Sequence, residues 1–176
     1  GSPLESAART AFWVASGHPH LFAGIAPMGA NWQWGNIENW GLMNVPTLIL
    51  EGTMDANYVH ENTNRWHMLR THGCDIEILI GPYGHTHIFW EEPQFLQKIT
   101  AWAETKRRNL WPKRVRYATW NLRWHRAYWV SIRRMVDPRF AADVDVAVTG
   151  NTIEVKANNV AALQELEDPP EKEGKL

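Results

Sequence analysis

The sequence predicts an α/β protein, in which a parallel sheet with flanking helices precedes a small antiparallel β extension. Up to about residue 110, apolar β-branched runs alternate with segments of helical spacing, as expected for parallel β/α units. The run 45–50 is nearly all apolar, which is typical of a strand covered on both faces. Beyond residue 111 the runs become short and alternating, which indicates antiparallel strands.

The first part of the chain yields the following elements in order. Residues 6–17 have helical spacing and end at Gly17, and 22–28 form a short buried strand. An aromatic loop or short helix covers 31–43, and the clearest strand covers 45–50. A helix over 57–72 ends at Gly73, a strand covers 76–80, and a helix over 93–108 closes the series.

The second part predicts four short strands, at 115–120, 127–133, 144–149 and 152–157. Gly150 and Asn151 provide a tight turn between the last two. We therefore expect an α/β domain over 3–110 and an antiparallel β extension over 111–166. The tail 167–176 is charged and almost free of apolar residues, so we expect it to be disordered.

Composition narrows the class of protein. The chain is 44% apolar and 21% charged, with a formal net charge of −1, which is ordinary for a soluble globular protein. That balance does not favour nucleic-acid binding, and in the basic and aromatic segment 113–134 the charges fall on one strand face and most rings on the other. We expect no nucleic-acid partner. With no transmembrane run or signal peptide in view, we expect no membrane association, and a cytoplasmic location is favoured.

Eleven tryptophans make the chain Trp-rich. Most such rings serve core packing, because each buries a large apolar area. Trp32, Trp34 and Trp40 follow the strand 22–28, and the carboxyl ends of parallel strands line the ligand crevice of α/β sheets. These three are candidate substrate-binding residues for an ester, aryl or sugar ligand, or they seal an exposed sheet surface.

The strongest chemical signal is an aspartate and a histidine, each placed after an apolar strand. Asp55 follows the run 45–50, and His85 follows the run 76–80. At the ends of neighbouring parallel strands the two side chains would lie side by side, where an aspartate can orient an imidazole that acts as a base. Alternatively, Asp55 caps the helix 57–72 and His85 forms local hydrogen bonds.

His87 is the second candidate for the base, although it alternates with His85 and would point the other way in extended backbone. A metal site that uses these two histidines with Asp55 and His60 is possible, but a His-x-His pattern alone is common. We expect neither a metal nor a cofactor. The single cysteine, Cys74, excludes an internal disulfide and is interpreted as a small buried apolar residue.

The segments 18–30 and 45–55 and the pair Gly84-His85 together resemble the C-terminal half of an α/β-hydrolase, in the style of serine esterases and dipeptidyl-peptidase-like enzymes. The resemblance covers about residues 4–108, and 112–166 is similar to the β-rich extension of some members. It implies that Asp55 is the triad acid and His85 the triad base.

The nucleophile departs from the family pattern. The resemblance places the two elbow glycines on Ala7 and Ala8 and the serine on Glu5. Ser6 is the nearest hydroxyl, and it is interpreted either as a helix N-cap or as a displaced nucleophile. The five strands that precede this region in the family, with half of the oxyanion hole, have no counterpart in the sequence, so we expect a truncated fold.

Two functions follow. The favoured hypothesis is a hydrolase-derived protein that serves binding or assembly without catalysis, because a base without its nucleophile and oxyanion hole has little to activate. The alternative is a serine hydrolase acting on ester or peptide bonds through His85, Asp55 and either Ser6 or a nucleophile from a partner chain. Both predict a homo-oligomer joined through the open sheet edge at 22–28.

Overall fold

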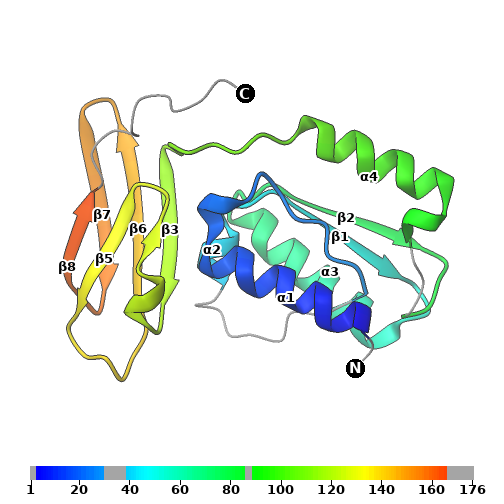
Figure 1. The fold of residues 1–176 in the computed structure, drawn as a ribbon, viewed down its shortest axis with the longest axis horizontal. Coiled ribbons are helices and arrows are strands. Elements are labelled where there is room, and N and C mark those ends of the chain that lie inside the picture. The colour runs from blue at the N-terminus through cyan, green and yellow to red at the C-terminus, as the bar shows by residue number, and fades with distance from the viewer. Residues whose placement is uncertain (1–2, 30–38, 86–88, 166–176) are drawn as a thin grey trace. The chain divides into compact units, whose positions relative to one another are not determined.

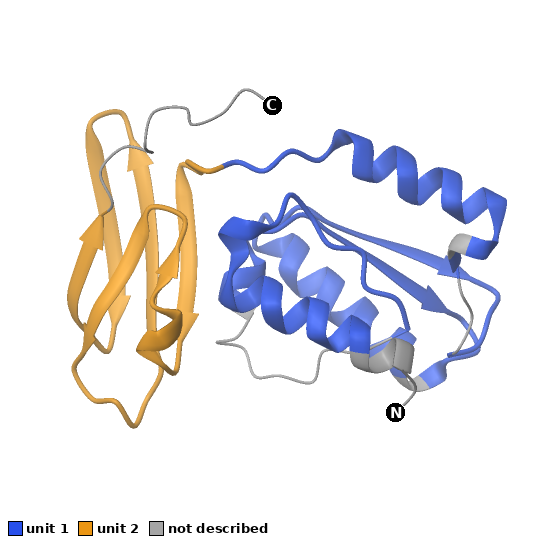
Figure 2. Cartoon of the chain, in the orientation of Figure 1, with its two compact units in different colours: residues 1–109 blue, residues 110–176 orange. Residues whose placement is uncertain are grey.

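A computed structural model describes residues 3–29, 39–85 and 89–165. The chain divides into two compact units, residues 1–109 and residues 110–176, coloured blue and orange in Figure 2. Unit 1 combines helices with a small parallel sheet, and unit 2 consists of antiparallel sheets. The α/β class predicted from the sequence is therefore confirmed.

In the described part of unit 1, the sheet is built on two parallel strands. Strand β1 (Thr47–Gly52) pairs with β2 (Ile76–Gly81) in a register that runs from Thr47 opposite Ile76 to Gly52 opposite Gly81. Every residue of β1 is buried, as expected for a strand with both faces covered. Both strands begin and end close to their predicted positions.

The predicted strand at 22–28 is only partly formed. Its backbone lies parallel to β1 on the side away from β2, but it is joined there by isolated bridges at Ile25 and Met28. The amide of Ile25 donates to the Pro46 carbonyl, and the Leu50 amide donates to the Pro27 carbonyl. Because proline has no N–H, Pro27 cannot supply the alternate ladder bond between these two, and a regular strand does not develop.

Helices cover both faces of this sheet (Figure 1). On one face, α1 (Pro3–Gly17) and α3 (Ala56–Thr71) pack through Phe12, Ala15 and Leu69 on Ile49 of β1. On the other face, α4 (Pro93–Thr105) packs through Phe95 on Leu48 and Leu50. The short helices are η1 (Pro19–Leu21), α2 (Asn39–Leu42) and η3 (Phe89–Glu91). Within the described ranges, none of the helices has the length and apolar character needed to cross a bilayer.

Helix ends show where the sequence patterns were accurate and where they failed. Helix α3 ends as predicted: Gly73 has φ +75°, its amide donates to the Arg70 carbonyl, and the Cys74 amide donates to the Leu69 carbonyl. This is a Schellman motif with glycine in the left-handed position. Helix α4, in contrast, ends at Thr105 and not at 108, and the Lys106 ammonium instead donates to Asp75 at 2.9 Å.

Helix α1 begins at Pro3, earlier than the predicted residue 6. Ser6 therefore lies inside the first turns of the helix, and its interpretation as an N-cap is wrong. Proline near the helix start explains the difference, because its fixed φ suits the first helical turn, where an N–H has no partner in the helix.

Residues 110–165 of unit 2 form six strands in two three-stranded sheets, where the sequence predicted four strands. The first sheet has the order β3-β6-β7 and the second the order β4-β5-β8. The strands are β3 (Arg114–Thr119), β4 (Arg126–Ala127), β5 (Val130–Met135), β6 (Ala142–Thr149), β7 (Thr152–Asn158) and β8 (Val160–Glu165), and a short helix η4 (Leu122–Trp124) precedes β4.

Two details account for the difference in strand number. The predicted strand at 127–133 is divided because Tyr128 takes a φ of +54° and turns β4 into β5, with Ala127 opposite Val130. Strand β8 carries no clear alternation in the sequence and is held by its pairing with β5. The predicted turn at Gly150 is confirmed: Gly150 has φ +58°, and Thr149 lies opposite Thr152.

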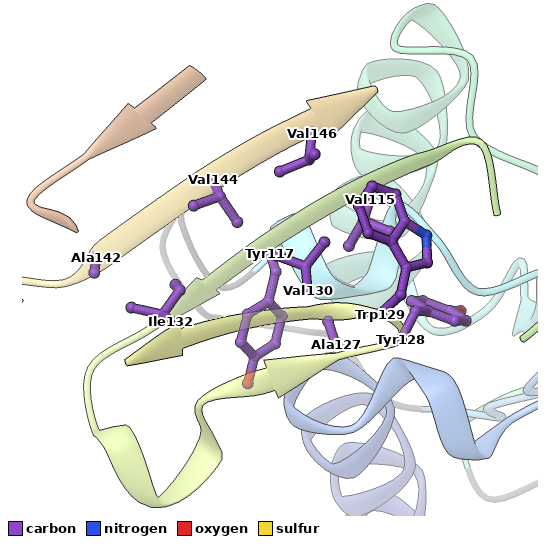
Figure 3. Packing of buried hydrophobic residues seen from close by; sticks show 10 residues of the cluster. All are labelled: Val115, Tyr117, Ala127, Tyr128, Trp129, Val130, Ile132, Ala142, Val144 and Val146. Carbon is purple, nitrogen blue, oxygen red and sulfur yellow. The ribbon is translucent and has the colours of Figure 1, made fainter. Parts of the chain in front are cut away.

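The core of unit 2 lies between its two sheets (Figure 3). Val115, Tyr117, Val144 and Val146 contribute from one sheet, and Val130 and Ile132 from the other. The alternate residues of β3 face outward, where Arg114 donates two hydrogen bonds to Asp145 of β6. The predicted division of β3 into a charged face and an apolar face is thus present. Strand β7 differs, since all seven of its residues are exposed.

Candidate active site

The structure brings Asp55 and His85 into direct contact. The Nδ1 atom of His85 lies 2.6 Å from Oδ2 of Asp55, and the side chains are 29% and 10% exposed. A carboxylate accepts the Nδ1 proton in this arrangement, which leaves Nε2 as the basic nitrogen of the ring. A short hydrogen bond in a half-buried position holds the imidazole in one orientation.

The backbone explains why two residues so distant in sequence meet. After β1, a turn closes with the Asp55 amide donating to the Gly52 carbonyl at 3.0 Å. The two residues between Gly52 and Asp55 bond to the end of β2 and the loop after it. The Thr53 amide donates to the Gly81 carbonyl, and the Met54 amide donates to the Tyr83 carbonyl. The turn after β1 and the loop after β2 are therefore bonded to one another at the carboxyl ends of the parallel strands.

Two glycines allow the loop after β2 to lie directly over the strand ends. A Cβ on Gly52 would overlap the carbonyl oxygen of Tyr83. A Cβ on Gly29, at the end of the 25–29 segment, would lie 2.7 Å from the carbonyl oxygen of His85. The His85 loop thus crosses β1 and reaches the segment on its far side, and this close approach of backbone to backbone requires glycine.

Asp55 also occupies the N-cap position of α3, which was the alternative interpretation of this residue. Its side chain makes no capping hydrogen bond, and its carboxylate is directed to His85. From the next residues of α3, Tyr58 packs its ring on the His85 ring, with centroids 4.9 Å apart and planes tilted by 51°. The hydrogen bond to Asp55 and the ring contact with Tyr58 therefore both hold the imidazole.

Sequence reasoning missed a second carboxyl group, on which the charges of this pair act. Glu51 of β1 is completely buried, and its Oε1 accepts a hydrogen bond from Nδ2 of Asn62 on α3 at 2.7 Å. Burial is the main reason that the pKa of Glu51 is raised to about 7, and the negative charge of Asp55 acts in the same direction. A glutamate inside an otherwise apolar strand was the available signal for it.

The other predicted site residues do not gather here. Trp40, half-buried on α2, precedes β1, and the next residue Gly41 packs on Ser16 near the C-terminal end of α1. Helix α2 lies at the end of the sheet where β1 begins, opposite the strand ends that are followed by Asp55 and His85 (Figure 1). Trp32, Trp34 and His87 lie outside the described residues, as does the side chain of Ser6.

Of the residues considered for a metal site, Asp55 and His85 meet, but His60 does not join them. His60 is exposed on α3, with its Nε2 3.2 Å from the amide nitrogen of Asn64. Across the part of the chain that the structure describes, three side chains of the kinds that bind metals nowhere come together. Cys74 is a half-buried cysteine beside the core under α1 and α3, where we expected a buried one.

No protein-family model matches the sequence, and no curated protein matches it. The α/β class and the Asp55–His85 geometry therefore carry the functional argument.

Substitution of Gly29 tests how the site is held. We expect Gly29→Ala to destabilise the protein by about 2 kcal/mol and to displace His85, because a positive φ of +58° and a close carbonyl both oppose a Cβ. Gly73→Ala is the matched control, since its φ is also positive but its surroundings are open. For the control, chemical denaturation should show that the free energy of unfolding falls by only about 1 kcal/mol. Equal losses for the two variants would contradict the close packing at Gly29.

Proposed function

We propose that residues 3–109 form an α/β-hydrolase-like unit whose Asp55–His85 pair is the acid–base part of a site that hydrolyses ester or peptide bonds. The observation that carries this proposal is the 2.6 Å contact between Nδ1 of His85 and Oδ2 of Asp55. In such a site His85 takes the proton of an attacking hydroxyl through Nε2 and later returns it to the leaving group. Asp55 orients the ring and stabilises its protonated form.

The position of the pair supports this proposal. Active sites of α/β sheets form at the carboxyl ends of the strands, where βα loops meet. Asp55 follows β1 and His85 follows β2 at that end, and the two loops are joined by backbone hydrogen bonds. A pair that served only to stabilise the loops would not require an imidazole with its side chain 29% exposed.

The proposed nucleophile is Ser6 or a hydroxyl group supplied by another chain. The 25–29 segment supports the second possibility. It forms hydrogen bonds to β1 through alternate residues, so the N–H groups of Ala26 and Met28 point away from β1. Neither of these two N–H groups makes a backbone hydrogen bond to a described residue. A parallel strand paired at this edge would end beside His85, since Gly29 contacts the His85 carbonyl.

The same edge underlies the proposed homo-oligomer, because unpaired strand edges associate or become covered. We expect light scattering coupled to size exclusion to show a dimer of the 20.3 kDa chain. A monomer at high micromolar concentration would contradict self-association, and the hydroxyl would then have to come from Ser6 or from a different protein.

A second candidate function is binding or assembly without catalysis. Two observations favour it. Glu5 occupies the place where the resemblance puts the serine, and Ser6 lies within α1 and not at a strand-to-helix turn. A strained turn is what exposes the nucleophile of such enzymes.

One experiment separates the two functions. The protein is incubated with a fluorophosphonate probe and with short-chain p-nitrophenyl esters, beside the variants Ser6→Ala and His85→Ala. Labelling that disappears in both variants establishes a hydrolase with Ser6 as nucleophile. Turnover that needs His85 but not Ser6 assigns the nucleophile elsewhere, and mass spectrometry of the labelled peptide locates it. If neither labelling nor turnover is seen, the hydrolase proposal is contradicted and the binding or assembly function is supported.

A further inference from the structure

The charges of Asp55 and His85 both act on a completely buried carboxyl group, that of Glu51 in β1. We propose that Glu51 is a positioning residue for this pair and that it works in its neutral, protonated form, so that its ionisation loosens the hold of Asp55 on His85. The catalytic consequence rests on the proposed function, whereas the coupling between the three groups does not.

The backbone places Glu51 under the site. Glu51 lies opposite Ile80 of β2, and on its other side the Gly29 amide donates to the adjacent Leu50 carbonyl. Gly29 in turn contacts the carbonyl oxygen of His85. The loop that carries His85 therefore passes over the end of β1 where Glu51 lies, and the turn to Asp55 begins at the next residue, Gly52.

The surroundings of the side chain favour a neutral carboxyl group. Glu51 and its partner Asn62 are both 0% exposed. Asn62 donates to Oε1, while Oε2 has no hydrogen-bond partner among the described residues. An ionised carboxylate needs several donors or a counter-charge to offset its loss of hydration, and the Asn62 amide with the Gly52 backbone N–H does not supply them. A protonated carboxyl group at this position avoids that cost.

Among the described residues, the charged groups that act on Glu51 are those of Asp55 and His85. Asp55 in the turn after β1 raises its pKa, and His85 in the loop after β2 lowers it, while the side chain that reaches it from α3 is the uncharged Asn62. Its neighbours in register, Ile80 and Gly29, carry no charge. Ionisation of Glu51 would place two carboxylates around one imidazole. Asp55 would be repelled, and the ring would be drawn toward both.

The coupling can be measured without catalysis. In ¹⁵N-labelled protein, the proton between His85 and Asp55 is followed by NMR and assigned by its loss in His85→Ala. In the wild type we expect this resonance to shift as the pH crosses about 7, where Glu51 ionises. In Glu51→Gln, which keeps a neutral side chain of the same size, we expect that shift to be lost. The control Glu77→Gln changes an exposed carboxyl group on β2 and should behave like the wild type. The same pH dependence in Glu51→Gln and the wild type would overturn the proposal.

A second measurement covers the case in which Glu51→Gln does not fold. Side-chain carboxyl carbons of glutamate are titrated in ¹³C-labelled wild-type protein. One carboxyl carbon that changes near pH 7 together with the His85 resonance supports the proposal. If every glutamate carbon changes well below pH 7, Glu51 is ionised in the native protein and the proposal is wrong.

The catalytic consequence is measured through the fluorophosphonate labelling rate. We expect Glu51→Gln to match the wild type at pH 6 and to exceed it by up to about tenfold at pH 8, where the wild-type carboxylate disturbs the pair. Equal rates at both pH values would overturn the positioning role. Loss of labelling in all proteins, with the NMR coupling intact, would instead contradict only the proposed hydrolase.

Discussion

Replacing Asp55 with asparagine is expected to lower the fluorophosphonate labelling rate by about 10⁴-fold and to leave the fold unchanged. The carboxylate accepts a proton from Nδ1 of His85 at 2.6 Å, so it selects the ring tautomer whose Nε2 is basic. An asparagine can present its NH₂ group at the same place, which favours the opposite tautomer and removes the negative charge that stabilises imidazolium.

Asp75→Asn is the matched control for this variant. Asp75 makes the same kind of charged contact, at 2.9 Å to Lys106, but its side chain is 54% exposed and it lies before β2, at the other end of the strand. We expect wild-type labelling in this control. Circular dichroism should show both variants folded. A labelling rate in Asp55→Asn within tenfold of the wild type would mean that Asp55 does not orient a catalytic base.

The second large effect is on stability, and it comes from Glu51. Its pKa rises from an ordinary value of 4.5 to about 7 in the folded protein, mainly because of burial. Below pH 4.5 the group is protonated in both the folded and unfolded states, and its contribution to stability is fully present. Between pH 4.5 and 7 the folded state binds the proton more tightly, so this contribution is lost as the pH rises. The total loss is about 3 kcal/mol.

The difference in free energy of unfolding between the wild type and Glu51→Gln isolates this contribution from other titrating groups. We expect urea denaturation to show that the wild type loses about 3 kcal/mol relative to this variant between pH 4.5 and 7.5. The difference in free energy of unfolding between the wild type and Glu77→Gln should not change over this pH range. A flat difference for Glu51→Gln as well would show that the buried carboxyl group does not take up a proton in this range.

Sequence patterns identified the Asp55–His85 pair but not the buried carboxyl group of Glu51. Asp55 and His85 could be found because each follows an apolar run, and the carboxyl ends of parallel strands meet at one edge. Glu51 could not be recognised as part of the site from the sequence. The effect of burial on its carboxyl group depends on Asn62, which lies eleven residues further on in α3. Spacing alone does not reveal that partner.

The elements missed from sequence share a physical cause, which is that tertiary contacts decide them. Pro27 interrupts a run that otherwise has the composition of a buried strand. Only the backbone hydrogen bonds between this segment and β1 show which bond the proline removes. Tyr128 adopts a positive φ that is unusual for a bulky residue, so the division of 127–133 was not foreseeable. Strand β8 forms because β5 offers it a partner.

The exposed strand β7 has a consequence for how the protein behaves at high concentration. It lies at the edge of its sheet within the described residues, and Ile153 and Val155 remain 42% and 46% exposed. A bare strand of this kind is a template for stacking into fibrils. Glu154 and Lys156 alternate with these apolar residues and interrupt the run, so charge on the opposite face acts as a gatekeeper. Neutralising both would leave an exposed edge strand without the charges that oppose its stacking.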